Sequence, residues 1–193
     1  MKHTTIYLVR HAHSTYTPDE YGRELSQKGL DDAKSVTELM KTRHVDVVLS
    51  SPYQRAIATV EGIAKGNDQQ VNVIEDLKER VLAEKPVEDF AAAIEAVWSD
   101  ESFSFEGGES NEAARQRGSD ALFKILHTYE GKSVVIGTHG NIMVLLMSYF
   151  DSHYDVEFWR SLDMPDVYKL SFHGENLTEV ERVWNPELKK VYL

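Results

Sequence analysis

Short apolar runs alternate along the chain with segments in which apolar residues recur at helical spacing. Four runs rich in β-branched residues predict buried strands, at residues 6–9, 45–49, 71–74 and 134–136. Two further runs, residues 167–172 and 178–183, predict strands near the carboxyl end, the later one at an edge of the sheet.

The intervals between the strands carry the helical pattern. After the first strand, apolar residues from Leu30 to Met40 recur at helical spacing. Ser26 stands before them as a predicted N-cap, and Leu25 and Leu30 would form a hydrophobic staple across it. This pattern predicts an amphipathic helix that covers one face of the sheet.

Two strand ends lead directly into helix starts. Ser51 followed by Pro52 predicts an N-cap with proline at the first helical position, opening a helix that runs to about Lys65. After the fourth strand, residues 138–141 lead into an apolar helix over residues 142–150. The same strand-turn-helix arrangement is therefore predicted twice.

Residues 80–110 interrupt this alternation. A helix candidate around residues 90–98 is followed by the acidic, turn-rich stretch SDESFSFEGGES, and a second candidate runs from residue 111 to about 129. We interpret residues 80–110 as an insertion that covers the site as a lid. Its aromatic side chains either line that lid or pack the insertion onto the rest of the chain: Phe90, Trp98, Phe103 and Phe105.

Alternating strands and helices predict an α/β fold with three layers, α/β/α, around a mostly parallel central sheet. A length of 193 residues is ordinary for one domain, so we expect a single domain over residues 1–193. The chain contains no cysteine, which excludes disulfides and a cysteine nucleophile.

Charge and hydropathy narrow the classes of partner. The formal charge of −11 argues against a nucleic-acid surface and leaves small anions possible only at a local cluster of Arg and His. The longest apolar stretch, residues 142–150, is far shorter than the about 20 residues of a membrane span. The amino-terminal residues resemble a first strand rather than a signal peptide. We therefore expect a soluble, cytoplasmic protein without a membrane partner.

Chemically competent side chains follow the ends of the predicted strands. Arg10 and His11 end the first strand, Arg55 lies beyond the second, Glu79 beyond the third, and His139 ends the fourth. Ligands of such sheets bind beyond the carboxyl ends of the strands. The cluster suits a phosphate, and a neutral histidine within it could attack phosphorus while a carboxylic acid protonates the leaving oxygen.

Five motifs carry a resemblance to a known family. In this order and at these separations, LVRHAHS, SSPYQRA, LKER, GGES and GTHGN resemble the histidine phosphatase superfamily, also called phosphoglycerate mutase-like, in its phosphatase branch. The resemblance implies a metal-independent acid phosphatase or phosphomonoesterase that needs no cofactor and forms a phosphohistidine.

Residue by residue, the resemblance implies that His11 is the nucleophile. Arg10, Arg55 and His139 would hold the phosphate, with His139 also counted as catalytic, and Glu79 would be the proton donor. The substrate would be a small phosphorylated molecule, with inorganic phosphate as the product.

Other residues near the motifs are secondary candidates. Ala12 and His13 stand where the family usually has Gly and then Glu or Gln, and Thr17 where Asn is common. His13, Ser14 and Thr17 are possible substrate contacts. For the proton donor, Glu84 and Glu109 are the alternatives to Glu79.

Three other functions stay open. His11 and His13 could ligate a metal ion in a metal-dependent hydrolase. The chain could also be a mutase, which returns the phosphoryl group to a hydroxyl of the substrate. It could instead be a non-catalytic module that binds phosphate without turning it over. The oligomeric state is left open.

Overall fold

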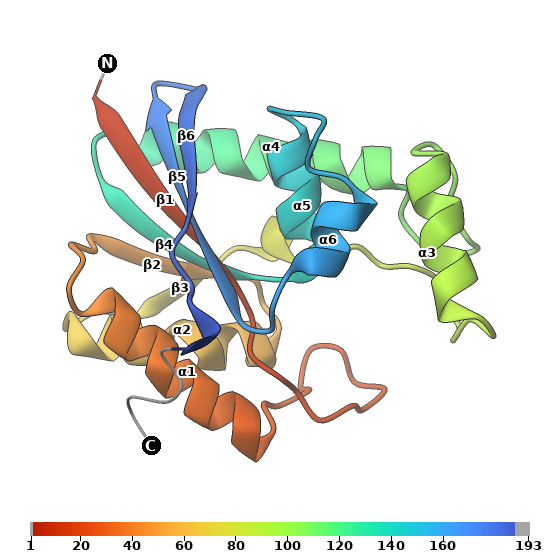
Figure 1. Cartoon of the computed structure of the whole chain (residues 1–193), viewed down its shortest axis with the longest axis horizontal. Coiled ribbons are helices and arrows are strands. Elements are labelled where there is room, and N and C mark those ends of the chain that lie inside the picture. Colours follow the sequence, from red (N-terminus) through yellow and green to blue (C-terminus); the bar gives the residue numbers. More distant parts are fainter. Residues whose placement is uncertain (1, 188–193) are drawn as a thin grey trace.

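The computed structural model describes residues 2–187, in which a twisted six-stranded sheet is flanked by helices (Figure 1). The strand order is β3-β2-β4-β1-β5-β6. Strands β1 to β4 are parallel to one another. Strand β5 is antiparallel to its neighbour β1, and β6 is antiparallel to its neighbour β5. The strand bounds are β1 His3–Arg10, β2 Val47–Ser50, β3 Val71–Val73, β4 Ser133–Thr138, β5 Asp166–His173 and β6 Asn176–Arg182. The predicted mostly parallel sheet and the edge position of the last strand are confirmed.

The register brings two strand ends together at the centre of the sheet. Arg10, the last residue of β1, is paired with Thr138, the last residue of β4. On the other side of β4, Ser50 at the end of β2 is paired with Gly137. The residues that follow these strands therefore emerge at one edge, where a binding site is expected.

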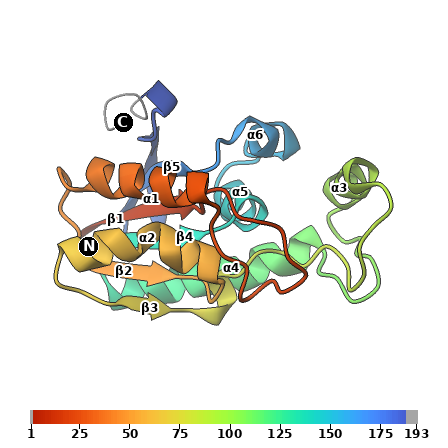
Figure 2. The ribbon, with the colours of Figure 1, turned by 90° about the horizontal axis from the view of Figure 1, so that it is seen from below.

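Helices cover both faces of the sheet (Figure 2). Along β1, side chains alternate between the faces: Tyr7 and Val9 pack with α1 (Gln27–Met40) and α2 (Gln54–Gly66), and Ile6 and Leu8 pack with α4 (Asn111–Thr128) and α5 (Gly140–Ser148). This alternation is the period of two expected for a strand buried on both sides. The predicted three-layer α/β/α architecture is confirmed.

The start of α1 is partly as predicted. Ser26 is the N-cap, and its Oγ accepts a hydrogen bond from the Gly29 N–H at 3.1 Å. The predicted hydrophobic staple is wrong, because Leu30 is 44% exposed. Leu25 is instead buried with Ala12 and Ala33, so it anchors the loop that follows β1 to the helix.

The predicted cap of α2 is wrong. The helix begins at Gln54, its N-cap is Tyr53, and no side chain caps it. Ser51 is buried, and its Oγ lies 2.7 Å from the Nε2 atom of His139. A buried imidazole needs a partner, so the Ser51 hydroxyl serves His139, while its oxygen also accepts the Tyr53 N–H at 3.3 Å, one residue before the helix begins.

The segment between β3 and α4 holds a short 3₁₀ turn, η1 (Glu75–Leu77), and the helix α3 (Phe90–Ser99). The predicted helix at residues 90–98 is thus confirmed, while η1 and α6 (Val156–Ser161) were not predicted. In α6, Asp155 caps the first turn by accepting from the Glu157 N–H at 2.9 Å and the Phe158 N–H at 3.1 Å. Among the described residues, no helix has the length and apolar character needed to span a bilayer.

Candidate active site

A cavity of about 650 Å³ opens at the carboxyl ends of β1 and β4. Arg10, His11, Arg55 and Glu79 line it. His139 lies directly behind, with its ring centroid 5.2 Å from that of His11. The structure therefore brings together all five residues predicted as the core of the site.

His11 is held in one orientation by the backbone. Its Nδ1 atom lies 2.7 Å from the Ala12 carbonyl oxygen, which can only accept, so we assign the ring proton to Nδ1. Thr59 Oγ1 accepts from the Ala12 N–H at 3.0 Å and fixes the loop. The Nε2 atom consequently keeps its lone pair, and it accepts from the Arg55 Nε–H at 3.4 Å.

His11 is neutral at physiological pH. Burial is the main reason that its pKa falls from 6.5 to about 3, and only the hydrogen bond to the Ala12 carbonyl acts in the opposite direction. Three cations lower the pKa further, namely Arg55, Arg10 and Arg23. The site thus presents an unprotonated imidazole, as a nucleophile requires.

His139 is fully buried behind this nucleophile. Burial lowers its pKa well below the ordinary value, and the neighbouring His11 and the arginines add to the effect. Its Nε2 atom is 2.7 Å from Ser51 Oγ, which also accepts the Tyr53 N–H at 3.3 Å. We assign the Ser51 O–H as donor to Nε2, which leaves a proton on Nδ1, an atom without a partner among the described residues. His139 is therefore a neutral donor.

Arg55 is almost entirely buried, with 3% of its surface exposed. Its Nη1 donates to the Glu20 carbonyl oxygen at 2.8 Å, and its Nη2 donates to Glu20 Oε2 at 2.9 Å. The guanidinium carbon lies 4.7 Å from the ring centroid of Tyr53. A carboxylate thus contacts the cation that is predicted to bind phosphate, so an incoming anion competes with Glu20.

Arg10 is fixed at the site by the loop before β5. Its Nη1 donates to the carbonyl oxygens of Leu162 and Asp163, both at 3.2 Å. Its Nε atom is buried without a hydrogen-bond partner among residues 2–187. Burial lowers the pKa of Arg10, although acidic side chains nearby oppose this effect. Even so, an arginine stays charged at neutral pH, so Arg10 supplies a fixed cation.

The start of α5 approaches these groups closely because residue 140 is glycine. A Cβ atom at Gly140 would lie 3.0 Å from Arg10 Nε and 3.1 Å from the Nε1 atom of Trp159. Contacts this short are tighter than real Cβ atoms tolerate without a shift of the neighbour. Any larger residue at this position would therefore displace the arginine.

Glu79 ties the start of α5 to the site. Its Oε1 accepts from the backbone N–H groups of Arg80 at 2.9 Å and Ile142 at 2.8 Å. Its Oε2 accepts from the Asn141 backbone N–H at 2.9 Å and from Asn141 Nδ2 at 3.4 Å. The free N–H groups expected at this helix start are thus bound by a carboxylate.

Comparisons with known proteins show the family of this chain. Residues 6–185 match the model of the histidine phosphatase superfamily (branch 1). The chain belongs to this superfamily. It is a phosphatase, and a phosphohistidine intermediate is typical of the family, so the resemblance found in the motifs is confirmed.

Relatives of this histidine phosphatase include several named phosphatases. Phosphoserine phosphatase 1 of Hydrogenobacter thermophilus is 30% identical in an alignment that covers 69% of this chain and 70% of the length of that protein. The metal-independent phosphoserine phosphatase of Arabidopsis thaliana is 31% identical over 72% of this chain and 66% of its own. A mycobacterial glucosyl-3-phosphoglycerate phosphatase superimposes with a TM-score of 0.75 at 21% identity, covering 95% of this chain and 99% of its own, which shows the shared fold.

The alternative acids of this histidine phosphatase lie in different surroundings. Glu84 is exposed and lines the cavity. Glu109 accepts from Arg117 Nε and Nη2, both at 2.8 Å. Although burial favours the neutral acid, Arg117 and the Val81 N–H hold the pKa of Glu109 below its ordinary value. Glu109 is therefore an ion-pair partner, poorly suited to donate a proton.

The secondary candidates lie at different depths. Ser14 lines the cavity, whereas His13 and Thr17 are not among its lining residues. His13 is exposed, with Nδ1 2.8 Å from Ser26 Oγ, and Thr17 Oγ1 donates to the Asp19 carbonyl at 3.3 Å. Their roles as substrate contacts stay predictions. Within residues 2–187, no three or more His, Cys, Asp or Glu side chains form a group that could hold a metal ion.

Arg23 is a site residue that sequence reasoning missed. It lines the cavity, its charge contributes to the low pKa of His11, and its Nη2 donates to the Thr17 carbonyl at 2.9 Å. It also forms an ion pair with Glu20. The signal was the polar loop after His11, which has to cross the site on its way to α1.

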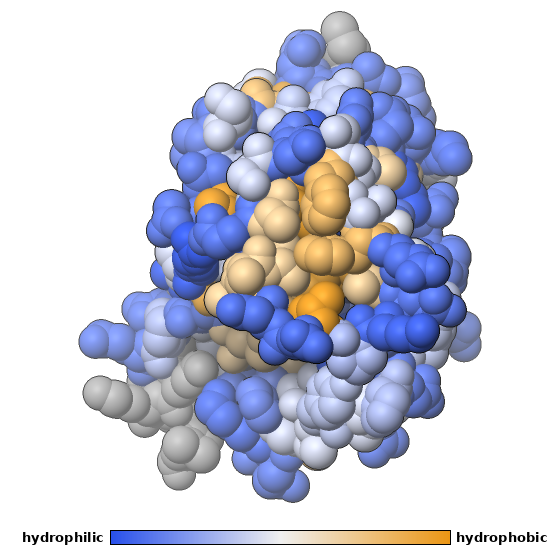
Figure 3. Space-filling model, turned by 90° about the vertical axis from the view of Figure 1, so that its right-hand side faces the viewer, coloured by the Kyte–Doolittle hydropathy of each residue, from blue (hydrophilic) through white to orange (hydrophobic). Residues whose placement is uncertain are grey.

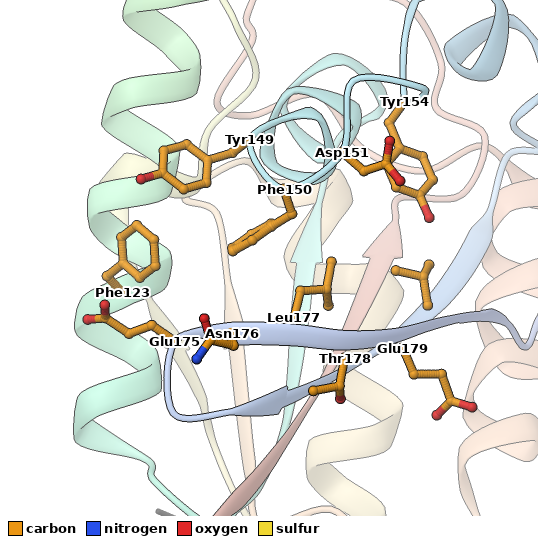
Figure 4. A pocket seen from close by; sticks show the side chains of 11 residues that line it. Phe123, Tyr149, Phe150, Asp151, Tyr154, Glu175, Asn176, Leu177, Thr178 and Glu179 are labelled. Atoms are coloured by element: carbon orange, nitrogen blue, oxygen red, sulfur yellow. The ribbon is translucent and has the colours of Figure 1, made fainter.

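Another cavity, of about 600 Å³, lies between the end of α5 and β6 (Figure 4). The Phe123 and Phe150 rings form one side of it, and Asp151, Glu175 and Glu179 supply negative charge. Its eleven lining residues, all within the described part of the chain, include no Arg, Lys or His. A phosphate would find no cation there, so the cavity at His11 is the candidate active site.

Proposed function

We propose that this phosphatase hydrolyses phosphate monoesters of small molecules through a phosphoryl group carried on Nε2 of His11. The observation that carries the proposal is the state of this ring: its Nδ1 is bound to a carbonyl, and its Nε2 faces the Arg55 guanidinium. A neutral imidazole fixed in this way has its lone pair directed at the position where an arginine would bring phosphorus.

The phosphate would be held by three groups. Arg55 and Arg10 supply cationic N–H donors, and the Nδ1–H of His139 supplies a neutral one. All three are buried or nearly so, and in such surroundings a hydrogen bond to developing negative charge is worth more than in water. Phosphate has to displace the Glu20 carboxylate from Arg55 to reach this position.

The reaction would proceed in two steps. The Nε2 lone pair forms a bond to phosphorus as the ester P–O bond breaks, and Glu79 gives a proton to the leaving oxygen. Water then attacks phosphorus and returns a proton to Glu79, while the P–N bond breaks and inorganic phosphate is released. The Glu79 carboxylate accepts four hydrogen bonds, and the longest is the one from Asn141 Nδ2 to Oε2, at 3.4 Å. We therefore assign Oε2 as the atom that carries the proton.

The substrate is proposed to be a small phosphorylated metabolite in the cytoplasm. Named relatives act on phosphoserine and on glucosyl-3-phosphoglycerate, and one is called metal-independent. The proposed mechanism uses an imidazole, two guanidinium groups and a carboxyl group, and so requires neither a metal ion nor a cofactor.

Replacement of the nucleophile tests this function. We expect His11→Ala to lower kcat for p-nitrophenyl phosphate by about a thousandfold or more, because no neighbouring group can form the covalent intermediate. The control is His13→Ala, which removes an exposed imidazole two residues away and should leave folding intact. Comparable turnover in His11→Ala and the wild type would refute the nucleophile assignment.

A further inference from the structure

The cavity has a second wall that the phosphoryl chemistry does not use. Beyond the cationic end, apolar side chains from the segment after Glu79, from α3 and from the loop before β5 line it: Leu82, Ala83, Val87, Phe90, Ile94 and Met164. Figure 3 looks onto the side of the molecule where α3 lies and shows apolar residues gathered in one area with hydrophilic residues around it. The alcohol part of a bound ester would lie against this wall.

Phe90 is held at the cavity by the way α3 begins. Asp89 caps the helix by accepting the Ala92 N–H at 3.0 Å, and Ile94, one turn after Phe90, is only 2% exposed and fixes the helix to the body of the protein. Phe90 itself remains 57% exposed while it lines the cavity. An aromatic ring in this position gains free energy only when another apolar group covers it.

The charged groups along this wall are exposed or already paired, with the exception of two nitrogen atoms of Arg80. Glu84 and Lys85 are exposed, and exposed charges contribute little to binding in water. Arg80 lines the cavity and is 4% exposed; its Nη2 donates to Asn141 Oδ1 at 3.3 Å, while its Nε and Nη1 atoms are buried without a hydrogen-bond partner among residues 2–187. Glu20 is paired with Arg55 and Arg23 at the phosphate end.

We propose that this phosphatase acts preferentially on monoesters of apolar alcohols about the size of a benzyl or hexyl group, rather than on phosphoserine. The inference rests on the proposed function, because it assigns the leaving alcohol to the wall formed by Val87, Phe90 and Met164. Contact with these side chains removes apolar surface of the substrate from water, whereas the ammonium and carboxylate of phosphoserine would have to give up hydration there.

The test compares benzyl phosphate and hexyl phosphate with O-phospho-L-serine. All three release an aliphatic alcohol that must be protonated, so a difference in kcat/KM reports on recognition of the alcohol rather than on leaving-group chemistry. We expect kcat/KM to be at least about tenfold higher for benzyl phosphate than for phosphoserine. An equal or higher value for phosphoserine would overturn the inference while leaving the proposed function intact.

A matched pair of variants locates the preference. Phe90→Ser should lower the ratio of benzyl phosphate to phosphoserine kcat/KM by about fivefold or more, since it removes one apolar contact surface. Phe103→Ser changes an exposed phenylalanine of the same insertion that is outside the cavity wall, and should leave the ratio unchanged. An unchanged ratio in Phe90→Ser would contradict the proposed wall.

Val87→Thr guards against loss of folding in the first variant, because it keeps the shape of the side chain and replaces one methyl group with a hydroxyl group. It should lower the same ratio, and an unchanged ratio would count against the inference. Absence of turnover on every ester, in a wild-type protein that also forms no phosphoenzyme, would instead overturn the proposed function.

Discussion

Two neutral imidazoles in a cationic pocket are the chemical centre of this molecule. His11 and His139 are buried beside Arg10 and Arg55, and burial more than the neighbouring charges lowers the pKa of both rings. Each ring also has one nitrogen bound, to the Ala12 carbonyl and to Ser51 Oγ respectively. The remaining nitrogen of His11, Nε2, contacts only the Arg55 Nε–H at 3.4 Å, and the remaining nitrogen of His139, Nδ1, has no partner among residues 2–187. These are the two atoms that the proposed mechanism directs at phosphate.

This description predicts an unusual titration. With a pKa of about 3, His11 should remain neutral throughout pH 5 to 8, and the low pKa of His139 should have the same effect. Imidazole ¹⁵N shifts of the phosphate-free enzyme should therefore show no protonation of either ring in this range. A midpoint near 6.5 for His11 would contradict the burial argument.

At the scale of elements, Glu79 has two functions that can be separated. Its carboxylate caps α5 through the Asn141 and Ile142 N–H groups, and we propose that it also protonates the leaving alcohol. Glu79→Gln keeps one of the two acceptor oxygens that the helix uses, places an NH2 group at the other, and cannot give up a proton. We expect kcat for benzyl phosphate to fall about a hundredfold or more, and kcat for p-nitrophenyl phosphate much less, because p-nitrophenolate hardly needs protonation.

If kcat fell equally for benzyl phosphate and p-nitrophenyl phosphate, Glu79 would only cap the helix and would not be the proton donor. Circular dichroism of Glu79→Gln and thermal unfolding are the controls for its capping function. Glu84→Gln is the matched variant at an alternative acid. The proposed mechanism predicts that the ratio of kcat for the two esters stays at its wild-type value in this variant.

The loop between β1 and α1 supplies a competitor for phosphate. Glu20 pairs with Arg55 at 2.9 Å, and its side chain is 47% exposed, so the pair is screened by solvent. We expect Glu20→Gln to lower the inhibition constant of inorganic phosphate about two- to fivefold, with a larger effect at low salt. Glu24→Gln, a change of charge in the same loop outside the cavity wall, is the control. A weaker affinity for phosphate in Glu20→Gln would show that Glu20 supports the site instead.

The same elements show which features could be predicted from sequence. Short apolar runs, strand-end chemistry and the five motifs located Arg10, His11, Arg55, Glu79 and His139, because their positions depend on local pattern and on the general rule for parallel sheets. The capping function of Ser51 was predicted wrongly, since its hydroxyl responds to a buried imidazole that is far away in sequence. Arg23 was missed for a related reason: only the path of the loop brings it into the cavity.

At the scale of the whole molecule, topology rather than any single residue builds the site. The order β3-β2-β4-β1-β5-β6 places β4 between β1 and β2, so groups from distant parts of the chain meet at one sheet edge. The segment between η1 and α4 then adds the apolar wall. The sheet order was not predicted, because strand runs of similar apolar character do not specify which strands become neighbours.

The most direct test of the central proposal is to isolate the phosphorylated enzyme. Wild-type protein mixed with substrate, quenched within milliseconds in base and digested, should carry one phosphoryl group on His11 by mass spectrometry. The modification should be stable in base and lost in acid, as expected for a P–N bond. A phosphoryl group on another residue, or turnover without any phosphorylated protein, would contradict the mechanism.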